Sequence, residues 1–514
     1  MFDRVEGRAG VVLTALLLFS LPLFGADNAR PPQHPFQEPG ARGEVDWLTV
    51  IPNRIPPLCH ERGDRWPLIL WKSGGYDALS EATIQMLLER GLTQHIKLDV
   101  GMIPAAQALQ KAGSPIIIME NRTGVWPYNL AGEATLWAHQ YPAASLPAQS
   151  SWRSKPSLTL FAGWHRAAEQ VRDTLGQYKD QGVTVNAVWL DWEGEPLLAS
   201  YLAARLSPTT SKRLPRSVLA DKKAFYRYRR QLWNQLMSAY VAAPVREIFP
   251  QVSVTNWVIT LSSPERPVLD WHNNPHPPLG PTLFTATTPI AYGIDTSYLS
   301  NWKKSFSYDQ EHVDRLYRHV ILRQVSDDAF NRQQMAPYLN AIPWVARWVP
   351  DHLNKRLPVM SRASYREALR HLWLRGVAGM QIYNVTAGIY QEMAIREVED
   401  GVAVYDEMLA YRPFLERGRV MNLDYPGVQA SAILWSGLLL EDQAIIRTVR
   451  QGEGEESLTI EPWPNALVTL KVPVQGVTYL LQRTEAGNIT VTKQPALRDD
   501  DGKCITSNLE NSQP

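Results

Sequence analysis

The chain has 514 residues, of which 45% are hydrophobic and 20% charged, a composition typical of a globular protein and not of a disordered chain. It holds 52 Lys and Arg against 51 Asp and Glu, so no broad basic surface exists to follow a phosphate backbone, and we expect no nucleic-acid partner. The 18 Trp and 20 Tyr are an excess of aromatic residues. Such flat rings stack on sugars as well as in protein cores, so the excess is compatible with a carbohydrate-binding groove and with ordinary packing.

The chain begins with an apolar run, VVLTALLLFSLPLFGA, preceded by Arg4 and Arg8. The run is short for a membrane span and ends in small residues before a polar stretch, which predicts a signal peptide over residues 1–26. The protein is then expected to be exported to the periplasm, the cell surface or the medium, with no stable membrane span once the leader is cleaved. An uncleaved N-terminal anchor is the alternative.

The two cysteines, Cys59 and Cys504, lie near the two ends of the mature chain. Export would permit one disulfide between them, although their spacing alone leaves open whether they pair. Two cysteines exclude a multi-cysteine zinc site. The histidines of the loop at residues 270–276 have no fixed geometry, so neither a metal nor a cofactor is expected.

After a Pro-rich lead over residues 27–65, short apolar runs alternate with amphipathic helical segments, the pattern of βα units around a parallel sheet. Helical segments such as 80–91, 164–182, 223–249 and 361–376 separate these runs, and several end at Gly. The expected strands are 68–71, 95–99, 115–121, 187–193, 252–258, 289–293, 336–344 and 379–384.

This order predicts an α/β fold, a TIM-like (β/α)8 barrel over residues 66–418. The rival is an open doubly wound sheet, which normally carries a glycine-rich phosphate turn after its first strand, and the segment SGGYDALS matches that turn poorly. Short alternating runs then predict a small β-sandwich domain over residues 419–494, followed by a disordered tail over 495–514.

The fourth predicted strand runs directly into two carboxylates, Asp191 and Glu193. Because side chains alternate along a strand, both point to the same side, into the mouth of the barrel. Two adjacent carboxylates do not both ionise readily, so one pKa rises and supplies a proton donor, as glycosidic cleavage requires. The alternative is structural: Asp191 caps the next loop and Glu193 forms an ion pair.

Polar and aromatic residues at the ends of the other strands suit a hydroxyl-rich ligand. No signature of a serine-hydrolase elbow, a zinc-protease helix or a P-loop competes with this interpretation. The candidate substrate-binding residues are Glu120, Asn121, Asn256, Trp257, Tyr292, Asp295, Asn340, Tyr383 and Asn384.

With the Asp-Trp-Glu strand in place, the order of segments resembles the hyaluronidase family of glycoside hydrolases over about residues 66–415. GLTQHIKLDVGMIP and SPIIIMENRTGVWPY are similar to its second and third strands, and AVWLDWEGEP to its catalytic strand. TPIAYGIDTSYL, PYLNAIPW and MSRASYREALRHLWLRGVAGMQIYN are similar to the closing segments. The chain lacks the family's disulfide cysteines and has Gly194-Glu195-Pro196 where the animal enzymes carry Trp and Arg.

The resemblance implies retaining, substrate-assisted hydrolysis of a polysaccharide that contains N-acetylhexosamine. The family's general acid corresponds to Glu193, and the carboxylate that positions the substrate acetamide corresponds to Asp191. The tyrosine that helps to hold the acetamide corresponds to Tyr298, or to Tyr292 if the alignment shifts.

Two other functions stay open. One is a barrel glycosidase on another polysaccharide that uses a different carboxylate pair, such as Glu193 with Glu120 or Asp295. The other is a non-catalytic carbohydrate-binding protein, since a fold does not dictate a function. The sequence leaves the exact sugar, endo or exo cleavage and the oligomeric state undetermined.

Overall fold

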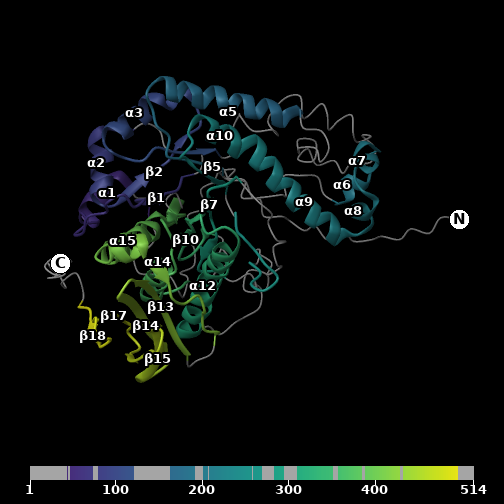
Figure 1. Cartoon of the computed structure of the whole chain (residues 1–514). Coiled ribbons are helices and arrows are strands. Elements are labelled where there is room, and N and C mark those ends of the chain that lie inside the picture. The colour runs from purple at the N-terminus through teal and green to yellow at the C-terminus, as the bar shows by residue number, and fades with distance from the viewer. Residues whose placement is uncertain are drawn as a thin grey trace, which may run out of the picture. The chain divides into compact units, whose positions relative to one another are not determined.

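The structure is a computed structural model (Figure 1). All of the described residues belong to one compact unit, which spans residues 36–514. The predicted leader lies outside the described residues, as does all but the first residue of the predicted tail. The described residues are 43, 47–72, 79–120, 162–190, 201–206, 208–256, 259–268, 283–294, 309–350, 353, 357–384, 388–428 and 432–495.

Three parallel sheets occupy the first four fifths of the described chain. Their orders are β2-β1-β11-β10-β8, β3-β4-β5-β6 and β7-β9. All eight predicted strand positions carry at least one of these strands. The bounds are β1 Leu68–Leu70, β2 Leu92–Gln94, β3 Ile96–Lys97, β4 Ile117–Glu120, β5 Ala187–Leu190, β6 Ser253–Asn256, β7 Ala286–Thr287, β8 Ile290–Tyr292, β9 Asn340–Ala341, β10 Trp344–Ala346 and β11 Gln381–Ile382.

The three sheets are linked by short backbone connections. Only His95 separates β2 from β3, and two residues separate β7 from β8 and β9 from β10. The Thr285 N–H, just before β7, donates to the Val254 carbonyl of β6 at 3.0 Å. Neighbouring strands therefore follow chain order, and a helix is described in each long crossover except that from β6 to β7. The predicted α/β fold with parallel strands is confirmed, while closure into a barrel stays a prediction.

Helices lie in most of the longer intervals between the parallel strands (Figure 1). Their bounds are α1 Trp47–Arg54, α2 Glu81–Glu89, α3 Ile103–Lys111, α5 Ala162–Asp180, α6 Tyr201–Leu206, α7 Pro208–Arg213, α8 Arg216–Ala220, α9 Lys222–Met237, α10 Ala243–Ile248, α12 Gln310–Met335, α14 Arg362–Trp373, α15 Gln391–Leu409 and α16 Arg412–Arg417. Short 3-10 turns span Val100–Met102 and Gly388–Tyr390, and a π-helical turn at Ser238–Ala242 joins α9 to α10.

Side-chain chemistry sets several helix ends. The Ser80 hydroxyl accepts a hydrogen bond from the Thr83 N–H at the start of α2, and Ser361 does the same for Ser364 at α14, which satisfies backbone donors that lack helical partners. Gly182, after α5, and Gly376, after α14, have φ of +74° and +78°. Glycine adopts this left-handed conformation without a Cβ clash, so the predicted glycine stops are observed.

Most residues on both faces of the parallel strands are buried. One face, which we call the inner face, carries a single apolar cluster, and the opposite face packs on residues of the helices. On β5, Ala187 and Trp189 belong to the inner face, whereas Val188 and Leu190 pack with α5 residues. The inner face consists of Ile69, Trp71, Ile117, Met119, Ala187, Trp189, Ala286, Tyr292, Ile294, Ile342, Trp344, Ala346 and Val349.

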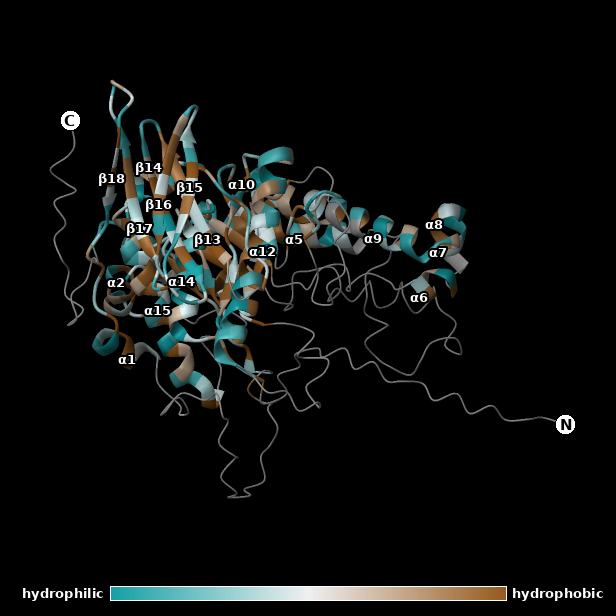
Figure 2. Ribbon diagram, turned by 90° about the horizontal axis from the view of Figure 1, so that it is seen from below, coloured by the Kyte–Doolittle hydropathy of each residue, from teal (hydrophilic) through white to brown (hydrophobic). Residues whose placement is uncertain are grey.

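Antiparallel sheets follow α16, as the alternating runs predict. A five-stranded sheet has the order β12-β13-β14-β17-β18, and β15 with β16 forms a hairpin whose apolar residues share a core with it. Figure 2 shows hydrophobic and hydrophilic residues interspersed along these strands, and buried and exposed residues alternate along most of β16. The bounds are β12 Arg419–Val420, β13 Ala432–Leu440, β14 Gln443–Gln451, β15 Glu456–Trp463, β16 Ala466–Val472, β17 Val477–Arg483 and β18 Ile489–Lys493.

Among the described helices, none combines the length and the apolar character needed to cross a membrane. Cys59 is disulfide-bonded, and the chain's other cysteine, Cys504, lies outside the described residues.

Candidate active site

The carboxyl ends of β4, β5 and β6 are aligned. Leu190, the last residue of β5, pairs in register with Glu120 of β4 and Asn256 of β6. The backbone thus reaches one common edge of the sheet immediately before Asp191. The predicted residues that lie outside the described part are Asn121, Asp191, Glu193, Trp257, Asp295 and Tyr298.

An aromatic cluster lies at the same ends of the other sheet. Tyr383, just after β11, stacks on Trp71, just after β1, with ring centroids 5.0 Å apart, and its centroid lies 5.1 Å from that of Tyr292 on β8. Trp71 and Tyr292 are buried and Tyr383 is half-buried. The fold therefore brings together two of the predicted residues, Tyr292 and Tyr383, and adds Trp71.

This aromatic cluster is continuous with the strand that leads to Asp191. Trp189 of β5 belongs to the same inner face as Trp71 and Tyr292, and Tyr383 packs against that face. Trp66 contacts Trp189 with ring centroids 6.4 Å apart. Trp71 and Trp66 carried no motif in the sequence, and only the aromatic excess pointed to residues of this kind.

Gln381 is a buried amide beneath Tyr383. It pairs in register with Ile69 and Trp344, both on the inner face, and is fully buried. Neither its side-chain nitrogen nor its oxygen has a hydrogen-bond partner among the described residues. Since a buried unsatisfied amide costs about 1–3 kcal/mol, this position favours a water molecule or a ligand hydroxyl.

Asn384 points away from the inner face, contrary to its predicted contact with substrate. Alternation places Tyr383 inward and the next residue outward, toward α15. The Asn384 side-chain N–H₂ donates to the Trp348 carbonyl at 2.6 Å and to Glu397 Oε2 at 2.8 Å. Its amide therefore supports a buried carboxyl group of α15.

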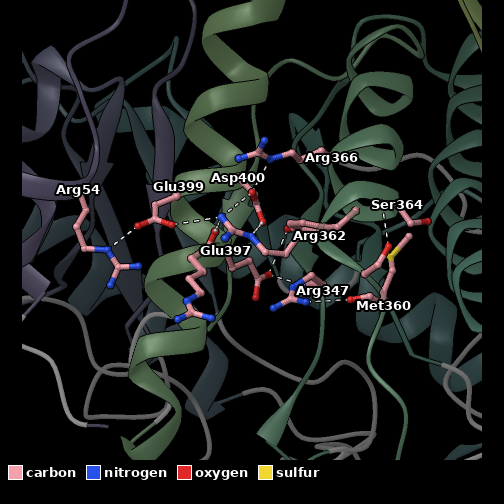
Figure 3. A network of polar contacts seen from close by, with 12 residues as sticks. Arg54, Arg347, Met360, Arg362, Ser364, Arg366, Glu397, Glu399 and Asp400 are labelled. Atoms are coloured by element: carbon pink, nitrogen blue, oxygen red, sulfur yellow. Dashed lines mark hydrogen bonds and ion pairs between the residues drawn. The ribbon is translucent and has the colours of Figure 1, made fainter. Parts of the chain in front are cut away.

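Glu397 of α15 accepts hydrogen bonds from three residues, of which Figure 3 labels Arg347. Besides Asn384, the Arg347 backbone N–H donates to its Oε1 at 2.7 Å and the Tyr365 hydroxyl at 3.2 Å. Burial disfavours the charged form and raises the pKa of Glu397 to about 7, although Asn384 and Arg347 oppose the rise. The sequence does not predict this buried carboxyl group. The periodicity of a helix indicates which of its residues are buried, but not which residues they bond.

The neighbouring acids of α15 form ion pairs with arginines (Figure 3). Asp400 accepts from Arg362 at 2.8 Å and from Arg366 at 2.5 Å, and Glu399 accepts from Arg54 at 2.6 Å. These pairs join α1, α14 and α15 on the helical side of the strands. These ion pairs indicate that the carboxylates of Glu399 and Asp400 have a structural role.

Two further predicted residues lie apart from the aromatic cluster. Asn256 is buried and shares the outer face with Leu190, its register partner, and its carbonyl accepts from the Thr288 hydroxyl at 2.5 Å. Asn340 is exposed and begins β9. It was expected at a carboxyl end, but the strand segment continues through β10 to Ala346, so Asn340 lies at the opposite end.

Within the described ranges, no three His, Cys, Asp or Glu side chains are grouped so that they could hold a metal ion. The histidine-containing loop at 270–276 lies outside those ranges.

No protein-family model matches the sequence, and no curated protein matches it either. The fold is similar to the α-amylase from Geobacillus thermoleovorans, with TM-score 0.43, 9% identity and coverage of 84% of this chain and 97% of that one. The α-galactosidase from Lactobacillus brevis has TM-score 0.43, 11% identity and coverage of 86% and 53%. A GH30 endoxylanase from Clostridium papyrosolvens has TM-score 0.30, 9% identity and coverage of 84% and 98%. Likenesses at this level assign neither a family nor a substrate to the chain.

Proposed function

We propose that the protein is a glycoside hydrolase whose active site lies at the carboxyl ends of the parallel strands, closed into a (β/α)8 barrel. Glu193 acts as the general acid and base, and Asp191 is its partner. The observation that carries this proposal is the alternation along β5, in which Ala187 and Trp189 face inward and Leu190 faces the helices.

We infer the orientation of the two carboxylates from this alternation. Residues two apart on a strand share a face, so a strand that continues past Leu190 directs Asp191 and Glu193 to the inner side. Trp189 also pairs in register with Met119 and Thr255, and Met119 pairs with Lys97, which is exposed. Trp189, in this row of paired residues, is two residues before Asp191 in the chain.

The chemistry follows from the separation of roles. Glu193 donates its proton to the glycosidic oxygen as the bond to the anomeric carbon breaks, and the substrate's acetamide oxygen forms the new bond to that carbon. Asp191 and Tyr298 hold the acetamide in position. Water then attacks the anomeric carbon and breaks its bond to the acetamide oxygen, while Glu193 takes the proton of the water, so two inversions retain the configuration. Tyr383 and Trp71 supply aromatic surface beside the sugar.

The test is hydrolysis by the full-length chain of hyaluronan and chondroitin, followed by viscosity and by new reducing ends. Glu193→Gln removes the donor at nearly constant shape and is expected to lower kcat by about 10²–10⁴-fold. Glu485→Gln, an exposed acid between β17 and β18, is the matched control and keeps full activity. Cleavage that is equal in the Glu193→Gln variant would refute the assignment.

Amylose and xylan, which lack acetamido groups, extend the test. Cleavage of these polymers that is lost in Glu193→Gln would keep the glycosidase and replace the substrate class, with Glu120 or Asp295 as the second carboxylate. Binding of any of the polymers without release of products would favour a carbohydrate-binding protein instead.

We also propose that residues 1–26 direct export. The test is N-terminal sequencing of the protein recovered from the periplasm, the cell surface or the medium, and a mature N-terminus at residue 27 is expected. Recovery of an uncleaved chain in membranes would identify the segment as an anchor.

A further inference from the structure

We propose that the C-terminal sheets contain a second carbohydrate site, a pocket that binds one sugar unit of a polysaccharide chain without cleaving it. The pocket has a volume of about 290 Å³ and lies among β12, β13 and β15. Ligand pockets usually span about 300–1,000 Å³, so this one suits a single ring. That its ligand is a carbohydrate rests on the proposed function, while its location rests on the pocket alone.

Arg419 places a positively charged guanidinium group at the pocket. It lies on β12, is exposed, and forms no ion pair or hydrogen bond with a described residue through its guanidinium group. Most arginines of the described chain are engaged, as Arg447 and Arg362 illustrate. A guanidinium group offers five N–H donors in one plane, which suits adjacent sugar hydroxyls.

Trp435 supplies the aromatic surface. It is half-buried on β13, where the Asn422 side chain donates to its carbonyl at 2.9 Å, and its ring packs at the edge of the core between the two sheets. Its indole N–H is not paired with any described residue. A partly exposed ring fixed on a strand stacks on the C–H face of a sugar at little entropic cost.

Glu461 and Thr459 complete the polar lining from β15. Glu461 Oε1 accepts from the Asn465 N–H at 2.7 Å, and its Oε2 has no partner among the described residues. The Thr459 hydroxyl is paired with that of Thr469 at 3.0 Å. The pocket thus offers both a carboxylate acceptor and an arginine donor, which fits hydroxyl groups because they both donate and accept, and the carboxylate disfavours an anion such as a phosphate.

The test measures binding separately from cleavage. The Glu193→Gln variant leaves the polymer intact, and its affinity for hyaluronan, chondroitin, amylose and xylan is measured by affinity electrophoresis. Adding Trp435→Ala or Arg419→Ala is expected to weaken binding to the preferred polymer by at least about tenfold. Leu467→Ala, which removes a side chain that is 72% exposed on the neighbouring strand, is the control and leaves affinity unchanged.

The same substitutions in the active protein should slow hydrolysis of long chains and leave short oligosaccharides unaffected. Arg419 is exposed, so its variant separates binding from folding, and near-UV circular dichroism checks both variants. Binding that is unaffected by Trp435→Ala and Arg419→Ala, or the absence of binding to all four polymers, would overturn the second site. Hydrolysis by the protein with intact Glu193 decides the proposed function independently.

Discussion

Arg447 of β14 donates to both carboxylate oxygens of Glu367 on α14, with Nε to Oε1 at 2.8 Å and Nη2 to Oε2 at 2.6 Å. Both residues are buried, and the pair crosses from the C-terminal sheets to the helices around the parallel strands. Burial opposes ionisation of Glu367, but the Arg447 charge outweighs it and holds the pKa of Glu367 well below its usual range. His371 reinforces the junction, since it contacts Glu367 at 3.3 Å and the Ser436 hydroxyl at 2.9 Å.

Replacing Arg447 with Leu is expected to lower the free energy of unfolding by about 3–5 kcal/mol, because Glu367 is left as a buried unpaired charge. Denaturant titration measures the loss. The double variant Arg447→Leu/Glu367→Leu should recover most of it, because neither member of the pair then stays buried without its partner. Arg172→Leu breaks an exposed pair with Glu247 and should cost less than about 1 kcal/mol. A double variant no more stable than the single one would contradict this account.

Glu397 makes the stability depend on pH in a defined direction. Its pKa rises from 4.5 in the unfolded reference to about 7 in the fold, so the folded state binds more protons in that window. Stability is therefore greatest below pH 4.5 with respect to this group and falls as the pH rises toward 7, by up to about 3 kcal/mol.

Glu397→Gln removes this titration and is the matched variant. The difference in unfolding free energy between wild type and variant, measured by urea titration from pH 4.5 to 8, cancels groups that titrate in both proteins. As the pH rises, the unfolding free energy of the wild type should fall relative to that of the variant. A constant difference would show that Glu397 ionises normally.

Gln381 tests whether the inner face holds an unsatisfied amide. Gln381→Met keeps the size of the side chain and removes the amide. It is expected to raise the free energy of unfolding of the ligand-free protein by about 1 kcal/mol, which denaturant titration measures. Gln110→Met serves as the contrast, because that amide bonds the Gly182 carbonyl and the Thr184 N–H and its loss should destabilise. Lower stability in Gln381→Met would indicate that a bound water satisfies the amide.

Tyr383 and Asn384 should separate binding from stability, because they are neighbours on opposite faces of one strand end. Tyr383→Ala removes aromatic surface at the proposed site and is expected to raise KM by about tenfold. Asn384→Leu deprives Glu397 of a donor and should cost about 1–3 kcal/mol of stability with KM unchanged. Steady-state kinetics with thermal unfolding of both variants checks the two outcomes, and a KM effect confined to Asn384→Leu would reverse the assignment.

The sequence by itself determined the order of strands and helices and several residues of the candidate site. Local periodicity identifies the strands around Leu68, Ile117 and Val188 because each is a short apolar run between polar turns, and glycine stops such as Gly182 depend only on local backbone conformation. It also identified Tyr292 and Tyr383 as residues at strand ends, and the pairing of Asp191 with Glu193 on one face stays its prediction.

Only the tertiary structure decided which neighbours meet. Whether Tyr383 or Asn384 faces inward depends on the register of β11 with β1 and β10, which no local pattern encodes. The position of Asn340 depends on how far its strand continues, and the raised pKa of Glu397 depends on burial by three separate elements. Arg447 and Glu367 lie 80 residues apart in the sequence. They pair because a charge that is buried away from water is destabilising unless an opposite charge lies beside it.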